Sequence, residues 1–192
     1  MSRKTLTLVD IIFPISQNKI LVLLRDIILV VTFGFLTGLS AKLKIEIGMV
    51  PFTFQTFVVL FSAILLGAKR AFFSQFFYLT MGILGVPWFA RGGGLSYILS
   101  PTLGYLLGFL FSVSLVGYLT ESGWTKSIKL FLLSLILGNL IIYFFGVLWL
   151  SNFVGFERSL KVGVLPFLLG DFLKIILLVF VFKGLFRITN RI

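Results

Sequence analysis

Residues 130–150 form an apolar run without a single charged side chain, and such a run is long enough to cross the hydrocarbon core of a bilayer as an α-helix. Similar runs lie before and after it, separated by short polar segments. Only 12% of the 192 residues are charged, whereas soluble domains carry about 25%. At roughly 20 residues for each span, the chain has room for six spans and for no soluble domain. We therefore expect an all-α integral membrane protein, with residues 1–192 forming one transmembrane domain.

The apolar runs and the polar segments between them predict where the spans begin and end. Lys69 and Arg70 indicate a tight basic turn, and residues 42–48 alternate polar and apolar side chains, as an extended segment or loop does. Residues 1–18 contain an apolar stretch too short for a signal-peptide core, with no small-residue cleavage site after it. We expect them to form an interfacial segment on the cytoplasmic face. The six predicted spans cover residues 20–41, 50–67, 71–86, 97–118, 130–150 and 162–185.

The distribution of positive charge predicts the orientation in the membrane. The net charge is +11, which in a soluble protein would indicate nucleic-acid binding, but here the positive-inside rule explains it better. Six spans place both termini on one side, where we expect Arg3, Lys4, Lys19, Arg25, Lys69, Arg70, Lys126, Lys129, Lys183, Arg187 and Arg191. The other side holds Lys42, Lys44, Arg91, Arg158 and Lys161. We therefore predict a multi-pass protein of the plasma membrane with both termini in the cytoplasm and no nucleic-acid partner.

Asp171 and Lys174 lie inside the last apolar run, deeper than any other charged residues. A charge near the bilayer centre costs roughly 2.5–3.5 kcal/mol on insertion scales, so it is rarely placed there without a use. Their i, i+3 spacing puts both side chains on one helix face, where they can pair and still offer acceptors and donors. The pair is either a structural ion pair between helices or a solute-binding site. We favour the binding site, because the rest of the chain offers a membrane bundle without catalytic chemistry.

A glycine-rich loop, residues 92–94, follows Arg91 on the predicted outer side. Glycines let backbone groups approach a ligand closely, and a neighbouring guanidinium can capture a carboxylate. The alternative is an ordinary hairpin loop with one exposed arginine. We place Gln55, Tyr78 and Gly93 in the same pocket as Arg91. Its apolar walls would come from aromatic residues that could equally be packing side chains, namely Phe52, Phe54, Tyr78 and Trp88.

The ligand that fits this predicted pocket has a polar head, an apolar middle and an acid at its far end. Asp171 and Lys174 would meet the head, and Arg91 would meet the acid.

Several kinds of chemistry are excluded by composition. The chain has no Cys and no His, so it has no disulfide, no thiolate metal site and no histidine general base. Its six acidic residues are scattered, and it contains no phosphate-binding Gly-x-x-x-x-Gly-Lys-[Ser/Thr] loop. We expect no metal, no cofactor and no enzyme activity.

Small residues form a strip in the second half of the first predicted span. Gly34 and Gly38, together with Thr37 and Ala41, are spaced four residues apart, which lets another helix approach closely. That helix belongs either to the same bundle or to a partner protein. We assign Gly34, Gly38 and Ala41 to partner docking, with packing inside the bundle as the alternative.

Four motifs, taken together and in this order, resemble the BioY family, the biotin-specific substrate-binding (S) components of energy-coupling factor (ECF) transporters. The resemblance covers about residues 20–185. The motifs are Pro51-Phe-Thr-Phe-Gln-Thr56, Gly82-Ile-Leu-Gly-Val-Pro-Trp-Phe-Ala-Arg-Gly-Gly-Gly94, Ser100-Pro-Thr-Leu-Gly-Tyr-Leu-Leu-Gly-Phe109 and Gly163-Val-Leu-Pro-Phe-Leu-Leu-Gly-Asp-Phe-Leu-Lys174.

This resemblance implies a six-helix S-component fold that captures biotin from outside and works with a transmembrane coupling subunit and two ABC-type ATPases. It also implies that Asp171 accepts from a ureido N–H, that Lys174 donates to the ureido oxygen, and that Arg91 pairs with the carboxylate of biotin. The opposite orientation, with Lys174 on the carboxylate, stays open.

Two other functions compete with this interpretation. The first is an autonomous secondary transporter of a small carboxylated solute, with Asp171 as a proton-coupling carboxylate. The chain is short for that class and shows no internal inverted repeat. The second is a membrane enzyme, in which acid–base catalysis would depend on Asp171 and Lys174 alone.

Overall fold

The computed structural model describes residues 7–12 and 17–189, with side chains described as far as residue 185. Two short strands, β1 (Lys44–Ile45) and β2 (Phe52–Thr53), pair antiparallel and form a hairpin after the first long helix. All other regular elements in this part of the chain are helical. The α-helices are α1 (Leu8–Ile12), α2 (Lys19–Lys42), α3 (Gln55–Ile83), α4 (Leu103–Glu121), α5 (Ile128–Val154), α6 (Phe156–Gly163) and α7 (Leu168–Thr189), and the 3-10 turns are η1 (Leu95–Leu99), η2 (Trp124–Lys126) and η3 (Leu165–Phe167).

Five helical segments among the described residues are long and apolar enough to cross a membrane. They are α2, α3, α4, α5 and the stretch Phe156–Leu185, in which α6 and η3 lead into α7. The predicted all-α membrane architecture is therefore confirmed. Residues 42–48 contain β1, in agreement with the predicted extended segment.

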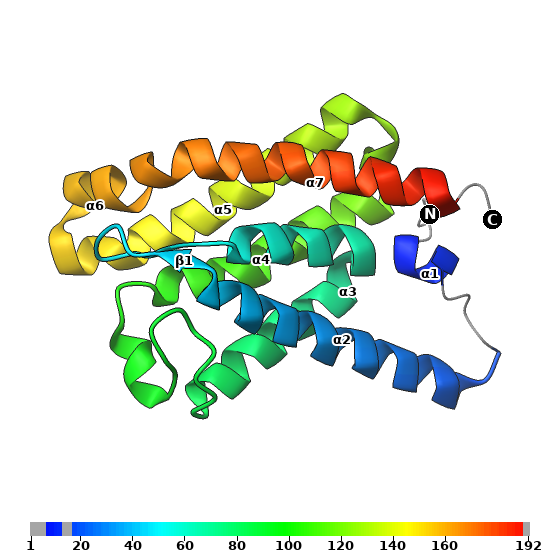
Figure 1. The fold of residues 1–192 in the computed structure, drawn as a ribbon, viewed down its shortest axis with the longest axis horizontal. Coiled ribbons are helices and arrows are strands. Elements are labelled where there is room, and N and C mark those ends of the chain that lie inside the picture. Colours follow the sequence, from blue (N-terminus) through cyan, green and yellow to red (C-terminus); the bar gives the residue numbers. More distant parts are fainter. Residues whose placement is uncertain (1–6, 13–16, 190–192) are drawn as a thin grey trace.

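Helix α3 is broken at Gly67, so the five segments correspond to six apolar helical pieces. The φ of Gly67 is 78° and its ψ is 177°, a backbone conformation that glycine adopts readily. Figure 1 shows the chain turning sharply at this point, with the two halves of α3 diverging from it. The break corrects the predicted turn at Lys69 and Arg70, because both residues lie inside the second half of α3. We call this break the elbow.

The elbow leaves helix ends inside the protein, and polar groups satisfy them. The backbone N–H of Ala68, which starts the second half of α3, donates to Glu121 Oε1 at 2.9 Å. A carboxylate at a helix N-terminus meets both a free amide and the positive end of the helix dipole. On the other side, Arg70 Nε donates to the Leu66 carbonyl at 2.9 Å. These hydrogen bonds stabilise the elbow within the bundle.

The small-residue strip of α2 faces this chain's own helices. A Cβ at Gly38 would lie 2.9 Å from the ring of Trp88, and one at Gly34 would lie 3.1 Å from the Ser74 carbonyl oxygen. Ala41 is fully buried. The strip therefore packs inside the bundle, as the alternative interpretation had it. A docking role for Gly34, Gly38 and Ala41 stays a prediction, and the surface it needs is covered by α3 and the loop that follows.

Helix α1 packs against the elbow end of the bundle, with Leu8 and Val9 buried. Asp10 accepts from both terminal nitrogens of Arg70, at 2.8 and 2.7 Å. Burial alone would raise the pKa of Asp10, but hydrogen bonds from Arg70 and Thr7 and the nearby positive charges keep that pKa below its ordinary value. Other residues of the predicted interfacial segment, among them Arg3, Lys4 and Pro14, lie outside the described residues.

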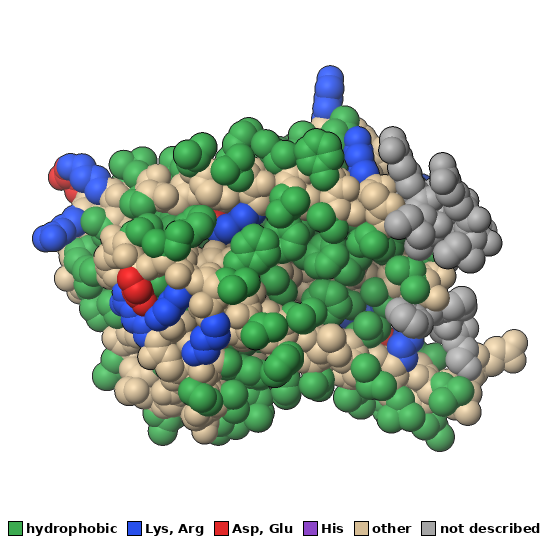
Figure 2. All heavy atoms as spheres, in the orientation of Figure 1, with side chains coloured by type: hydrophobic (Ala, Val, Ile, Leu, Met, Phe, Trp, Pro, Cys, Tyr) green, Lys and Arg blue, Asp and Glu red, His purple; other side chains and the backbone are tan. Residues whose placement is uncertain are grey.

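The surface of the bundle suits a membrane. In Figure 2, apolar side chains cover the middle of the molecule, while most Lys and Arg side chains gather toward its two ends. Helix α2 contributes strongly to this band, because Ile20, Leu23 and Ile28 are all more than 60% exposed. Lipid chains, and not water, are the natural contact for such a surface.

Candidate functional site

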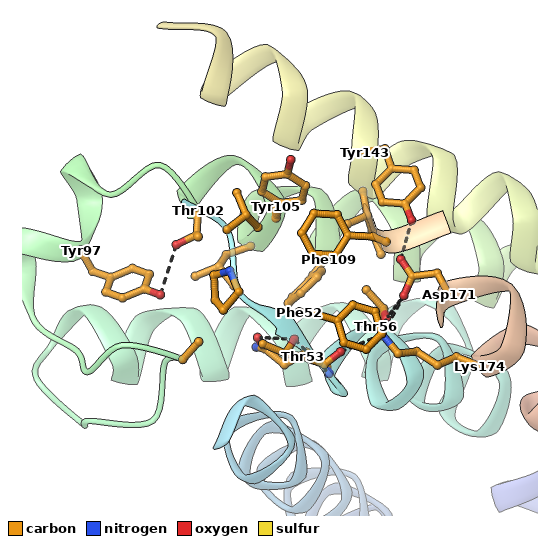
Figure 3. A pocket seen from close by; sticks show the side chains of 17 residues that line it. Phe52, Thr53, Thr56, Tyr97, Thr102, Tyr105, Phe109, Tyr143, Asp171 and Lys174 are labelled. Atoms are coloured by element: carbon orange, nitrogen blue, oxygen red, sulfur yellow. Dashed lines mark hydrogen bonds and ion pairs between the residues drawn. The ribbon is translucent and has the colours of Figure 1, made fainter. Parts of the chain in front are cut away.

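A cavity lies at the end of the bundle that carries the hairpin. The cavity has a volume of about 60 Å³. Its lining comes from six parts of the chain: the hairpin and the start of α3, the loop before η1, η1 itself, α4, α5, and the η3–α7 segment. Figure 3 shows that polar side chains gather at its two ends and aromatic rings lie between them.

Asp171 and Lys174 form the first polar end. Lys174 Nζ lies 2.7 Å from Asp171 Oδ1, and the two side chains are 8% and 5% exposed, respectively. The hydroxyl of Thr56 donates to Asp171 Oδ1 at 2.9 Å, and the hydroxyl of Tyr143 donates to Oδ2 at 2.6 Å. The sequence placed the charged pair on one helix face, and the structure turns that face into the cavity and adds two hydroxyl groups to it.

The ammonium group of Lys174 also holds the hairpin. It donates to the backbone carbonyl of Thr53 in β2 at 2.7 Å and to Thr56 Oγ1 at 3.0 Å. The ring centroid of Phe52 lies 4.0 Å from the same nitrogen, a cation–π contact. Lys174 therefore joins α7, the hairpin and the start of α3 at a single buried charge.

The start of α7 explains why these groups meet. Pro166 lies in the 3-10 turn that leads into the helix, and Asp171 lies in the first turn of α7, where the helix dipole favours a carboxylate. A Cβ at Gly170 would overlap the ring of Phe52, so only glycine leaves room for β2 here. Phe52 also stacks on Phe167, with ring centroids 6.0 Å apart.

The middle and the far end of the cavity have different chemistry. Phe52, Leu106 and Phe109 supply apolar lining between the two ends. At the far end, the Thr102 hydroxyl donates to the Tyr97 hydroxyl at 3.2 Å. The cavity thus offers an ionic end, an apolar middle and a neutral polar end, the order expected for a ligand with a polar head, an apolar body and a polar tail.

Gln55 and Tyr78 lie next to each other, but only Gln55 lines the cavity. Gln55 Nε2 donates to the Tyr78 hydroxyl at 2.8 Å. Tyr78 is fully buried behind it, packed between Trp88 and Phe89. Tyr78 therefore supports Gln55 from the side away from the cavity.

Arg91 and Gly93 do not line the cavity in this structure, although their neighbour Ala90 does. Arg91 is 38% exposed and is paired with Glu46 at 2.5 Å, and it also donates to the carbonyls of Gly48 and Met49. Hydrogen bonds from Arg91 and Lys44 lower the pKa of Glu46 to about 2. The arginine thus ties the loop before α3 to the loop after it, beside the cavity.

Two residues of the ionic end, Thr56 and Tyr143, were missed as site residues. Thr56 belongs to a recognised motif, but nothing in the sequence singles it out from its neighbours. Tyr143 lies in the uncharged run, one helical turn after Asn139, and the i, i+4 pair of polar side chains in such an apolar helix is the signal that could have found it.

Comparison with protein families gives a match to the BioY family over residues 10–191. A probable biotin transporter BioY from Pyrococcus horikoshii is 38% identical over 151 residues, which cover 78% of this chain and 89% of that protein. The biotin transporter BioY of Thermotoga maritima is 35% identical over 155 residues, which cover 80% of this chain and 90% of that protein.

A solved structure has the same fold. The crystal structure of the S-component for biotin from an ECF-type ABC transporter matches with a TM-score of 0.79. The two chains are 26% identical, and the match covers 90% of this chain and 95% of that one. The predicted S-component fold is therefore confirmed.

Proposed function

The chain belongs to the BioY family, and we propose that it is the biotin-binding S-component of an ECF-type vitamin uptake transporter. The observation that carries this proposal is the cavity, in which a buried ion pair faces an apolar middle and a polar far end. Biotin has a ureido head, an apolar bicycle and chain, and a carboxylate. The protein would act by binding and handing over its ligand, and not by catalysis.

In this proposal Asp171 accepts a hydrogen bond from a ureido N–H, and Lys174 donates to the ureido oxygen. Because the N–H groups of Lys174 already have three acceptors in the cavity, the ureido oxygen must take the place of one of them. Phe52 and Phe109 would flank the apolar body. A charge-assisted hydrogen bond in a site shielded from water is stronger than one between neutral groups, which supports tight binding.

The carboxylate of biotin would lie toward the far end of the cavity and its mouth. Arg91 follows Ala90, a lining residue, so rotation of its side chain away from Glu46 would bring the guanidinium to the mouth. Gly93 would let the loop backbone approach the ligand there. The alternative orientation places Lys174 on the carboxylate.

We also propose that both termini are cytoplasmic and that the cavity opens outward. In support, α1 and the end of α7 lie at one end of the molecule in Figure 1, whereas the hairpin and α6 lie at the other. The partners would be a transmembrane coupling subunit and two ABC-type ATPases, which would supply the energy that this binding subunit does not generate.

The test of this function is a binding titration of biotin against the purified, detergent-solubilised protein. We expect saturable binding with one biotin per chain, and biotin that stays bound through purification. Absence of binding would overturn the proposal. The alternative, a proton-coupled secondary transporter, predicts uptake by vesicles that collapses with an uncoupler and needs no ATPase.

A further inference from the structure

The hydrogen bonds at the ionic end leave Asp171 a limited capacity for a ligand. A carboxylate has about four acceptor positions, two on each oxygen. Oδ1 accepts from Lys174 at 2.7 Å and from Thr56 at 2.9 Å, and Oδ2 accepts from Tyr143 at 2.6 Å. Among the residues whose side chains the structure describes, no other donor contacts this carboxylate. One acceptor position, on Oδ2, is therefore left for a ligand.

Tyr143 shares that oxygen with the ligand and is itself held in place. It is 7% exposed and lines the cavity from α5. Asn139 lies one helical turn earlier on the same helix face and is also 7% exposed. The hydrogen bond to Asp171 and the burial of Tyr143 together hold this hydroxyl group in place when a ligand arrives. Figure 3 shows this hydroxyl pointing at Asp171.

We infer that Tyr143 is a positioning residue that restricts Asp171 to a single N–H from the ligand, so that the site selects a neutral ureido edge over a guanidinium edge. This inference rests on the proposed function. A ureido group needs one acceptor on this side and one donor for its oxygen. A guanidinium carries more N–H groups than a ureido group and has no oxygen that could accept a hydrogen bond from Lys174. It also brings a second positive charge close to the ammonium group of Lys174.

The experiment compares biotin with 2-iminobiotin, in which a protonated guanidino group replaces the ureido group at neutral pH. Dissociation constants are measured for the purified wild type, Tyr143→Phe and Tyr105→Phe. Tyr105 is the matched control, because it also lines the cavity, but its hydroxyl donates to the Gly163 carbonyl at 2.8 Å. Tyr143→Phe removes a donor from a buried carboxylate, so we expect it to weaken biotin binding by about tenfold.

The decisive quantity is the ratio of the two dissociation constants, because a merely structural role would weaken both ligands alike. In Tyr143→Phe the acceptor position on Oδ2 that the tyrosine hydroxyl occupies becomes open to the ligand. We therefore expect the affinity for 2-iminobiotin relative to that for biotin to rise at least tenfold. Tyr105→Phe should keep the wild-type ratio. Should Tyr143→Phe fail to fold, Tyr143→Met, which also removes the donor to Asp171, carries the test, with a shift in the same direction.

The possible results separate this inference from the proposed function. Wild-type protein that binds biotin, with an unchanged ratio of dissociation constants in the Tyr143 variant, overturns the positioning role and leaves the proposed function standing. An equal shift in Tyr105→Phe also overturns it, because the effect would then not pass through Asp171. Wild-type protein that does not bind biotin removes both.

Discussion

Two ion pairs lie near the cavity, one inside it and one beside it, and they differ in how far their side chains are exposed. Asp171 and Lys174 are 5% and 8% exposed, whereas Glu46 and Arg91 are 46% and 38% exposed. Water screens the outer pair, so it can open and close at little cost. The inner pair is surrounded by protein, where breaking it leaves a charge without compensation. The comparison suggests that the inner pair recognises the ligand and the outer pair controls access.

The largest effect should come from removing one member of the inner pair. We expect Lys174→Leu to lower the free energy of unfolding by about 3–5 kcal/mol, because Asp171 keeps a buried charge and the hairpin loses its anchor at Thr53. Thermal unfolding in detergent measures this change. In the double variant Asp171→Leu/Lys174→Leu most of the loss should be recovered, since two apolar side chains can replace a buried pair. A double variant as unstable as the single one would contradict this account.

The second effect concerns the ligand. We expect Asp171→Asn to weaken biotin binding by at least about 3 kcal/mol, roughly a hundredfold or more, because a charge-assisted hydrogen bond is lost and Lys174 is left without its carboxylate. The control is Glu157→Gln, which makes the same acid-to-amide change in an exposed pair with Lys161. Unchanged affinity in a titration of the purified Asp171 variant would remove this residue from the site.

Substitutions in the outer pair should have the smallest effect on biotin binding. They distinguish a contact of Arg91 with the carboxylate of biotin from a role of Arg91 in closing the loops. If the guanidinium reaches the carboxylate of biotin, Arg91→Gln should weaken binding by about tenfold, as the loss of one exposed charge-assisted contact does. Glu46→Gln should leave binding unchanged or slightly tighter, because it frees the arginine. Equal losses in both variants would mean that the pair only closes the loops.

The pH dependence of the outer contact has a defined direction. Glu46 has a pKa of about 2 in the folded protein, against an ordinary value of 4.5. Because the folded pKa is lowered, the contact contributes in full above pH 4.5 and is lost as the pH falls through about 2. Biotin binding measured between pH 5 and 8 should therefore be insensitive to the titration of Glu46.

Much of the fold follows from apolar runs, because a helix in a bilayer must satisfy all its backbone groups and therefore has few alternatives. The run at residues 130–150 lies wholly within α5. The elbow was misplaced for a physical reason. Lys69 and Arg70 looked like a solvent-exposed turn, but Arg70 pairs with Asp10 of α1, a contact distant in sequence. Local sequence does not reveal such a partner.

The site was predictable where charge was involved and not where neutral hydroxyl groups were. A charge in an apolar run has a high cost, so Asp171 and Lys174 stand out without any structure. Tyr143 and Thr56 carry no such cost and were found only through their contacts with Asp171. Arg91 shows the converse, because a residue can belong to a motif and still lie beside the cavity, and Tyr78, which was also predicted for the pocket, lies one layer behind it.

The elbow at Gly67 also affects the bilayer thickness that this protein fits. At 1.5 Å per residue, the two halves of α3 rise roughly 18 and 24 Å, less than the hydrocarbon thickness of about 30 Å. The loops that join α3 to its neighbours, in which Glu46 and Arg91 lie exposed, must make up the difference. A thinner bilayer should therefore suit this protein better than a thick one.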